Sequence, residues 1–336
     1  MKRREFGLDL IRAIAVIFVI SVHFYYNNGF YFQKMEGLSM WLAGSSRWLF
    51  YTCVPLFMLI TGYLRANDRP TKKYYSGLFR VVISWLIISL ICLCFRVGYY
   101  GTKKTVLQWI GDILNYGTAQ YSWYVEMYIG LILISPVINL ALDSLKKPKQ
   151  IWLLTGGVVL ATTLPTITSA RLLPEWWTAM YPIGYYMIGA AIRRTKPKIP
   201  PVAGLLGAAL CAMGMGLASL LTTNGGKFND GFSQGGYGGF WTTLMVTCLF
   251  LGVYRFRAGK RTGKVLSFCA AGVFEGYILS RLLDVWIYKT VKFWHNPETY
   301  ILIFLCVTIP VFILSMLAGR LVHSVSAWII KPRNKG

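Results

Sequence analysis

The 336-residue sequence has few charged residues, and acidic residues are especially scarce. Only 14% of the residues are charged, with 12 Asp and Glu against 35 Lys and Arg, whereas 55% are hydrophobic. The net charge of +23 would suggest nucleic-acid binding in a soluble protein. A mean hydropathy of +0.51 instead indicates a polytopic membrane protein, with membrane lipid as its partner and no nucleic acid.

Other signals of known chemistry are also missing. The three histidines, His23, His295 and His323, do not have the spacing of metal ligands, and the seven cysteines lie in apolar runs without a CxxC pair. The glycine-rich stretches 224–239 and 259–264 do not match a phosphate-binding loop. We therefore expect no metal and no permanently bound cofactor. Because no loop could hold a soluble domain, any chemistry must occur inside a helical bundle.

The apolar runs predict an all-α bundle of ten transmembrane helices that forms one domain, residues 1–336. The basic residues are dense in every second loop and at both ends of the chain, so the positive-inside rule places both termini in the cytoplasm. Pro55 predicts a kink in the second helix. The predicted spans are residues 6–26, 46–65, 78–100, 121–142, 151–169, 179–193, 202–223, 240–256, 266–288 and 300–322.

Two further features concern packing. Residues 101–119 are too polar to span a membrane, and their apolar residues recur at helical spacing, which predicts an outer amphipathic or re-entrant helix. Small residues in spans five to eight, such as Gly184, Gly189, Gly207 and Gly214, are expected at helix contacts.

The first span carries Asp9, Arg12 and His23 within an otherwise apolar run. An arginine at the bilayer centre costs roughly 3 kcal/mol, so such a residue is usually functional or paired. Arg12 and His23 are eleven positions apart, which puts them on one stripe of a helix about 16 Å apart. That stripe should face the protein interior. Equally, Asp9 and Arg12 could be a structural ion pair, and His23 a satisfied polar residue at the outer interface.

Further ionisable residues lie in later spans: Glu126 in the fourth, and Glu275 with a possible Arg281–Asp284 pair in the ninth. If these helices adjoin, they enclose a polar cavity. Histidine is a natural general base at neutral pH, and the arginine fork suits a phosphate-bearing donor such as cytoplasmic acyl-coenzyme A. A transporter of a glycan or a small anion could use the same residues, with His and Glu coupling protons.

Several segments resemble the membrane-bound acyltransferase 3 family. The first-span arginine and histidine are similar to that family's signature, and the later segments follow in the family's order. Thr61 stands where the family has serine, and Ser280 or Arg281 where relatives often have histidine. The matching segments are RAIAVIFVISVH (12–23), PLFMLITGYL (55–64), Arg80 after a basic loop, SWYVEMYIGLILISP (122–136) and, more weakly, GVFEGYILSRLLD (272–284).

The resemblance implies a multi-pass enzyme of the bacterial plasma membrane. It would move an acyl group, usually acetyl from acetyl-coenzyme A, to a hydroxyl of a cell-envelope carbohydrate. By the same resemblance His23 is the catalytic histidine, and Arg12 is its essential partner on the donor side. The residues expected to bind substrate are Tyr63, Arg80, Trp123, Tyr124, Glu126 and Glu275.

Overall fold

The computed structural model describes residues 4–167, 172–223, 226–228, 236–290 and 300–330. Within these ranges the chain forms helices and short 3-10 turns, with one isolated antiparallel bridge between Lys34 and Lys227. The predicted all-α architecture is confirmed. The α-helices are α1 Phe6–Asn27, α2 Gly37–Phe50, α3 Cys53–Arg65, α4 Lys72–Tyr100, α5 Val106–Leu114, α6 Trp123–Asp143, α7 Pro148–Thr163, α8 Tyr181–Thr195, α9 Pro201–Thr223, α10 Phe240–Val253, α11 Lys260–Ala271, α12 Val273–Thr290 and α13 Tyr300–Ile330.

Six helical segments in the described ranges are long and apolar enough to cross a membrane, or seven if the bent pair α11–α12 counts as one span. They are Phe6–Asn27, Gly37–Arg65, Tyr74–Tyr100, Gln120–Asp143, Pro201–Thr223 and Ile303–Ile330. The helices α7, α8 and α10 have 16, 15 and 14 residues, fewer than the about 20 that usually span a bilayer. The chain is a multi-pass membrane helix bundle, and the number ten stays a prediction.

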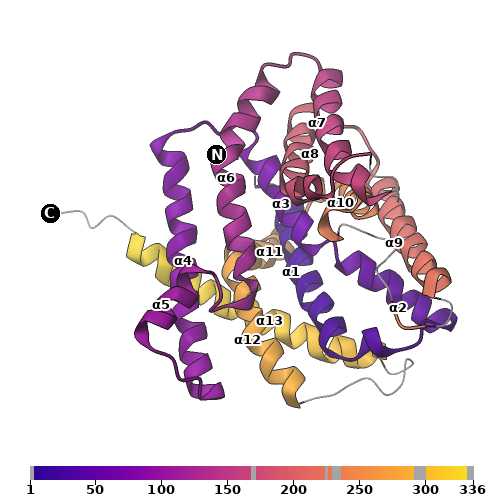
Figure 1. Ribbon diagram of the computed structural model, residues 1–336. Coiled ribbons are helices and arrows are strands. Elements are labelled where there is room, and N and C mark those ends of the chain that lie inside the picture. The colour runs from indigo at the N-terminus through magenta and orange to yellow at the C-terminus, as the bar shows by residue number, and fades with distance from the viewer. Residues whose placement is uncertain (1–3, 168–171, 224–225, 229–235, 291–299, 331–336) are drawn as a thin grey trace.

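Helix α1 is the central helix of the bundle. It contacts α2, α3, α10, α11, α12 and α13, and its buried residues face in several directions. Figure 1 shows α4 and α5 on one side of α1 and α7 to α10 on the other, while α13 runs past α4, α12 and α1. The ionisable residues of α1 therefore lie among protein side chains and not against lipid.

Two of the predicted spans are interrupted, the second near its expected kink at Pro55 and the ninth at Gly272. The break before α3 falls at Tyr51–Thr52, and Pro55 lies in the first turn of α3, where its missing N–H is tolerated. The predicted ninth span, residues 266–288, is bent: α11 and α12 meet at 71°. Gly272 lies at this bend, and any Cβ there would meet the backbone of Gly319 and Arg320 in α13. Close backbone packing therefore fixes the bend.

The short helix α5 matches the predicted outer amphipathic helix. A capping box between Thr105 and Gln108 begins it, and none of its residues is buried. Its apolar residues Val106 and Leu107 are 75% and 79% exposed. Such a helix suits a position in the membrane interface.

Glycines let the backbones of α3 and α8 touch. A Cβ at Gly189 would meet the carbonyl oxygen of Leu59, and one at Gly62 would meet that of Tyr186. Gly184 and Gly207 also lie against neighbouring helices. The expectation for Gly214 was wrong, because nothing lies within 4 Å of the place of its Cβ.

Gly189→Ala is expected to lower the thermal stability of the detergent-solubilised protein. The added methyl group must push α8 away from α3, and overpacking costs about 1–3 kcal/mol. The midpoint of thermal aggregation, read by size-exclusion chromatography after heating, measures this loss. The control is Gly214→Ala, which should leave the midpoint unchanged. Equal midpoints for the two variants would contradict the close α3–α8 contact.

Candidate active site

A polar cavity of about 520 Å³ opens between α1, α3, α4, α6, α12 and α13. It brings together four of the predicted site residues, which come from four different helices. Further polar residues lie beside them, among them Ser84 and His323. The ionisable and hydroxyl-bearing residues of the lining include Arg12, Arg65, Asp68, Arg80, Ser84, Tyr124, Tyr128, Glu275 and His323.

Arg12 is held at the cavity by a shared carboxylate. The Nη1 atom of Arg12 donates to Oδ1 of Asp9 at 3.0 Å, which confirms the predicted pair. Arg4, outside the span, donates to Oδ2 of the same aspartate at 2.6 Å. One buried carboxylate between two guanidinium groups leaves a net positive charge. The Arg12 side chain keeps 28% of its surface exposed, so it can still bind an anion.

Glu275 is almost fully buried and forms the second polar centre of the cavity. Its Oε1 atom accepts a hydrogen bond from the Ser84 hydroxyl at 2.9 Å and lies 3.1 Å from Nδ1 of His323. Ser84 also contacts the Ser326 hydroxyl at 3.1 Å.

The sequence did not identify His323 as a site residue, because the last span was expected to end at residue 322. Helix α13 instead continues to Ile330 and carries His323 inside the bundle. The signal that could have found it was a third histidine next to a long apolar run.

Two neighbouring cavities extend the site toward the N-terminal end of α1. One of about 640 Å³ shares Arg12 and Leu64 with the central cavity. The other, of about 830 Å³, shares Arg4, Glu5 and Arg193 with the first, and we call it the basic vestibule. Its cations make it attractive to phosphate groups. They are Arg4, Arg193, Arg194, Lys196, Arg255 and Arg257.

Tyr63 lies in the basic vestibule and not in the central cavity. Its hydroxyl accepts a hydrogen bond from Nη1 of Arg193 at 3.1 Å, and the same atom pairs with Glu5 at 2.6 Å. Tyr63 therefore lies in a different cavity from Tyr124 and Glu275. Arg193 lines both the basic vestibule and the 640 Å³ cavity, and Arg12 also lines the latter.

His23 lies at the opposite end of α1, outside the central cavity. Its ring stacks on Tyr121 with centroids 4.3 Å apart, and Tyr121 in turn stacks on Tyr277 at 5.7 Å. Because Tyr277 lines the central cavity, two tyrosine rings separate that cavity from His23. The half-buried imidazole is held by ring packing at the N-terminal end of α6.

Asp284 holds the first tyrosine of this stack, Tyr121, by a hydrogen bond. Its Oδ2 atom accepts a hydrogen bond from the Tyr121 hydroxyl at 2.7 Å. Arg281 lies over the Tyr121 ring, with Cζ 5.8 Å from the centroid. The predicted Arg281–Asp284 pair is therefore wrong: a tyrosine takes the hydrogen bond that was expected to go to the arginine.

Trp123 and Glu126 lie away from the central cavity. Trp123 stacks on Tyr237 with centroids 5.9 Å apart. Glu126 is exposed on α6 and does not line the cavity, although its neighbour Tyr124 does. Residues 123, 124 and 126 of one helix face different directions, so a linear motif did not reveal which of them reach the interior.

No three His, Cys, Asp or Glu side chains within the described ranges gather closely enough to hold a metal ion. The cavities can instead hold a polar, phosphate-bearing substrate through their guanidinium and ammonium groups.

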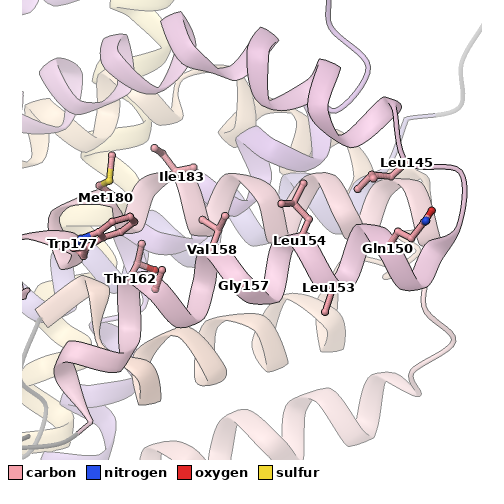
Figure 2. A pocket seen from close by; sticks show the side chains of 11 residues that line it. Leu145, Gln150, Leu153, Leu154, Gly157, Val158, Thr162, Trp177, Met180 and Ile183 are labelled. Atoms are coloured by element: carbon pink, nitrogen blue, oxygen red, sulfur yellow. The ribbon is translucent and has the colours of Figure 1, made fainter. Parts of the chain in front are cut away.

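A further large cavity has a different character. About 810 Å³ in volume, it lies along α7 and α8 beside η4 Glu175–Met180. Figure 2 shows Trp177 and Met180 at one end and Leu145 and Gln150 at the other, with Val158 between them. Among the described residues no ionisable side chain lines it, and those residues offer no group for proton or acyl transfer.

Residues 5–320 match the acyltransferase 3 family, whose model is described as an acyltransferase domain. This chain belongs to that family. The matched region includes α1 and all helices that line the central cavity, and it ends inside α13, three residues before His323. The protein is thus a membrane acyltransferase. No curated protein and no solved structure matches the chain.

Cysteine labelling can test access to the central cavity of this acyltransferase. Leu64→Cys, at a residue that lines two of the joined cavities, should react with a membrane-impermeant maleimide added from the side of the basic vestibule. The protein with its native cysteines gives the background. Gly214→Cys, exposed in the middle of α9, is the control and should stay unlabelled from either side of the membrane. Labelling of Leu64→Cys only from the opposite side would contradict this arrangement.

Proposed function

We propose that this acyltransferase moves an acyl group, acetyl in the first instance, from cytoplasmic acyl-coenzyme A to a hydroxyl of an extracytoplasmic or lipid-linked glycan. The setting is the bacterial plasma membrane, and acyl-coenzyme A acts as a co-substrate. One observation carries the proposal. Arg12 and Tyr277 line the same polar cavity, and the Tyr277 ring stacks on Tyr121, which in turn stacks on His23.

The basic vestibule supports acyl-coenzyme A as the donor. Coenzyme A carries several phosphate groups at one end and its thioester at the other. The vestibule cations can hold the phosphate end, and the adjoining cavities can take the extended arm past Arg12. Positive-inside topology places this end of α1 in the cytoplasm, where acyl-coenzyme A is made.

His23 would supply the general base for the transfer. Its neutral imidazole accepts the proton of the acceptor hydroxyl while the oxygen attacks the thioester carbonyl. A C–O ester bond forms, the C–S bond breaks, and the thiolate of coenzyme A takes the proton and leaves as a thiol. For direct transfer, the thioester must pass the Tyr121–Tyr277 stack. Family membership favours this enzyme over the transporter that the residues alone left open.

His23→Ala should abolish acyl transfer, because within the part of the chain that the structure describes the other histidine, His323, lines the central cavity and not this end of α1. Purified protein in vesicles, loaded with radiolabelled acetyl-coenzyme A and supplied with host envelope glycans, gives the rate. The binding of acetyl-coenzyme A by the variant should remain and shows that the protein is folded. Transfer at the wild-type rate by this variant would rule out His23 as the base.

Arg12→Lys should weaken acyl-coenzyme A binding about tenfold, equivalent to about 1.4 kcal/mol. Lysine keeps the charge but loses the planar fork that can bind Asp9 and a substrate oxygen together. Isothermal titration of the solubilised protein measures the dissociation constant. Arg320→Lys, at an arginine that lines none of the three joined cavities, is the matched control and should bind normally. Unchanged affinity in Arg12→Lys would leave Arg12 with a structural role alone.

A further inference from the structure

A second polar cavity lies on the other side of the tyrosine stack from the central cavity. About 250 Å³ in volume, it is enclosed by the C-terminal half of α4, residues 117–120 and α12. Its polar lining includes Arg96, Tyr100, Thr118, Gln120 and Arg281, and no acidic side chain of the described residues lines it. It is thus a small, positively charged cavity, which we call the outer cavity.

Arg281 connects the outer cavity to His23. Its guanidinium lies 5.8 Å from the centre of the Tyr121 ring, and His23 stacks on the same ring at 4.3 Å. A group bound by Arg281 would therefore lie one aromatic ring away from the imidazole. His23 does not itself line the outer cavity, so a hydroxyl of the bound molecule must extend beyond the cavity, past the Tyr121 ring, to reach the imidazole.

Among the described residues no carboxylate forms a direct ion pair with Arg281, and Asp284 attracts it only at longer range. Asp284, three residues along the same helix, accepts its hydrogen bond from Tyr121. The situation of Arg12 is different, because Asp9 contacts it directly. A half-buried guanidinium in a membrane helix is costly unless a counter-charge is supplied, and here a ligand can supply it.

Arg96 gives the cavity a second, fixed cation. It donates to the carbonyl oxygen of Gly117 at 3.1 Å and lies 3.9 Å from Asp112. Asp112 is also paired with Lys104 at 2.7 Å, so its single charge is shared between two cations. Arg96 is therefore positioned by its contacts but only partly neutralised.

On the proposed function, we infer that the outer cavity binds a negatively charged group of the acyl acceptor, a carboxylate or a phosphate, with Arg281 as its main ligand. The acceptor is thus an acidic glycan, and a hydroxyl near its charged group is the one that is acylated. A guanidinium pairs with both oxyanions through two parallel hydrogen bonds, which also fixes the orientation of the bound sugar.

The test uses wild-type protein in phosphatidylcholine vesicles with radiolabelled acetyl-coenzyme A inside. Envelope glycans of the host, separated by anion exchange into neutral and anionic fractions, are added outside. Wild type should label the anionic fraction. Arg281→Ala should raise the KM for that fraction at least tenfold, and Arg281→Lys should raise it less. Lys227→Ala removes an exposed cation that does not line the outer cavity, so it should change nothing.

Further experiments with the same vesicles identify the charged group of the acceptor and its source. Amidation of carboxylates or treatment with phosphatase shows which modification removes labelling of the anionic fraction. Preferential labelling of neutral glycans, or an unchanged KM in Arg281→Ala, would overturn the inference. Competitive inhibition by added anionic phospholipid would also overturn it, if Arg281→Ala abolishes that inhibition, because the cavity would then hold a lipid headgroup.

If Arg281→Ala does not bind acetyl-coenzyme A and is therefore misfolded, the comparison uses Arg281→Gln. Absence of labelling in both fractions by wild type would instead count against the proposed function.

Discussion

One buried carboxylate, that of Asp9, neutralises much of the positive charge at the N-terminal end of the central helix α1. Asp9 contacts Arg4 and Arg12 at the same time, and its own side chain is nearly inaccessible to solvent. Without it the two guanidinium groups, on partly exposed side chains, would repel each other at the edge of the bundle. With it, one excess positive charge remains where three cavities meet. The joined cavities are therefore both stable enough to form and attractive to an anion.

Aromatic rings divide the interior into two compartments. Stacking between His23, Tyr121 and Tyr277 fills the space between the central and outer cavities, and the Tyr121 hydroxyl is fixed by Asp284. Both compartments are lined by arginines, but Asp68 and Glu275 line the central cavity, whereas no acidic side chain of the described residues lines the outer one. They differ in size, about 520 Å³ and about 250 Å³, as expected if one takes a long cosubstrate and the other a single charged group.

The sequence predicted the helical class, most helix positions, the Asp9–Arg12 pair and four residues of the central cavity. These followed from long apolar runs, i to i+3 spacing and family motifs, all of which are local signals. It could not predict the bend at Gly272, which depends on backbone contact with α13. Nor could it predict that Tyr121 would contact Asp284 or that Glu126 would face outward. Those outcomes depend on how helices rotate against each other, and a linear spacing does not contain that information.

Helix α12 contributes side chains to both compartments. Within about two and a half turns it carries Glu275 and Tyr277 on the central cavity, Arg281 on the outer cavity and Asp284 on the tyrosine stack. The helix begins at a sharp angle directly after a glycine. Close contact between the backbones of α12 and α13 holds this angle. The spacing between the two compartments is thus set by one rigid helix, which acts as a ruler between them.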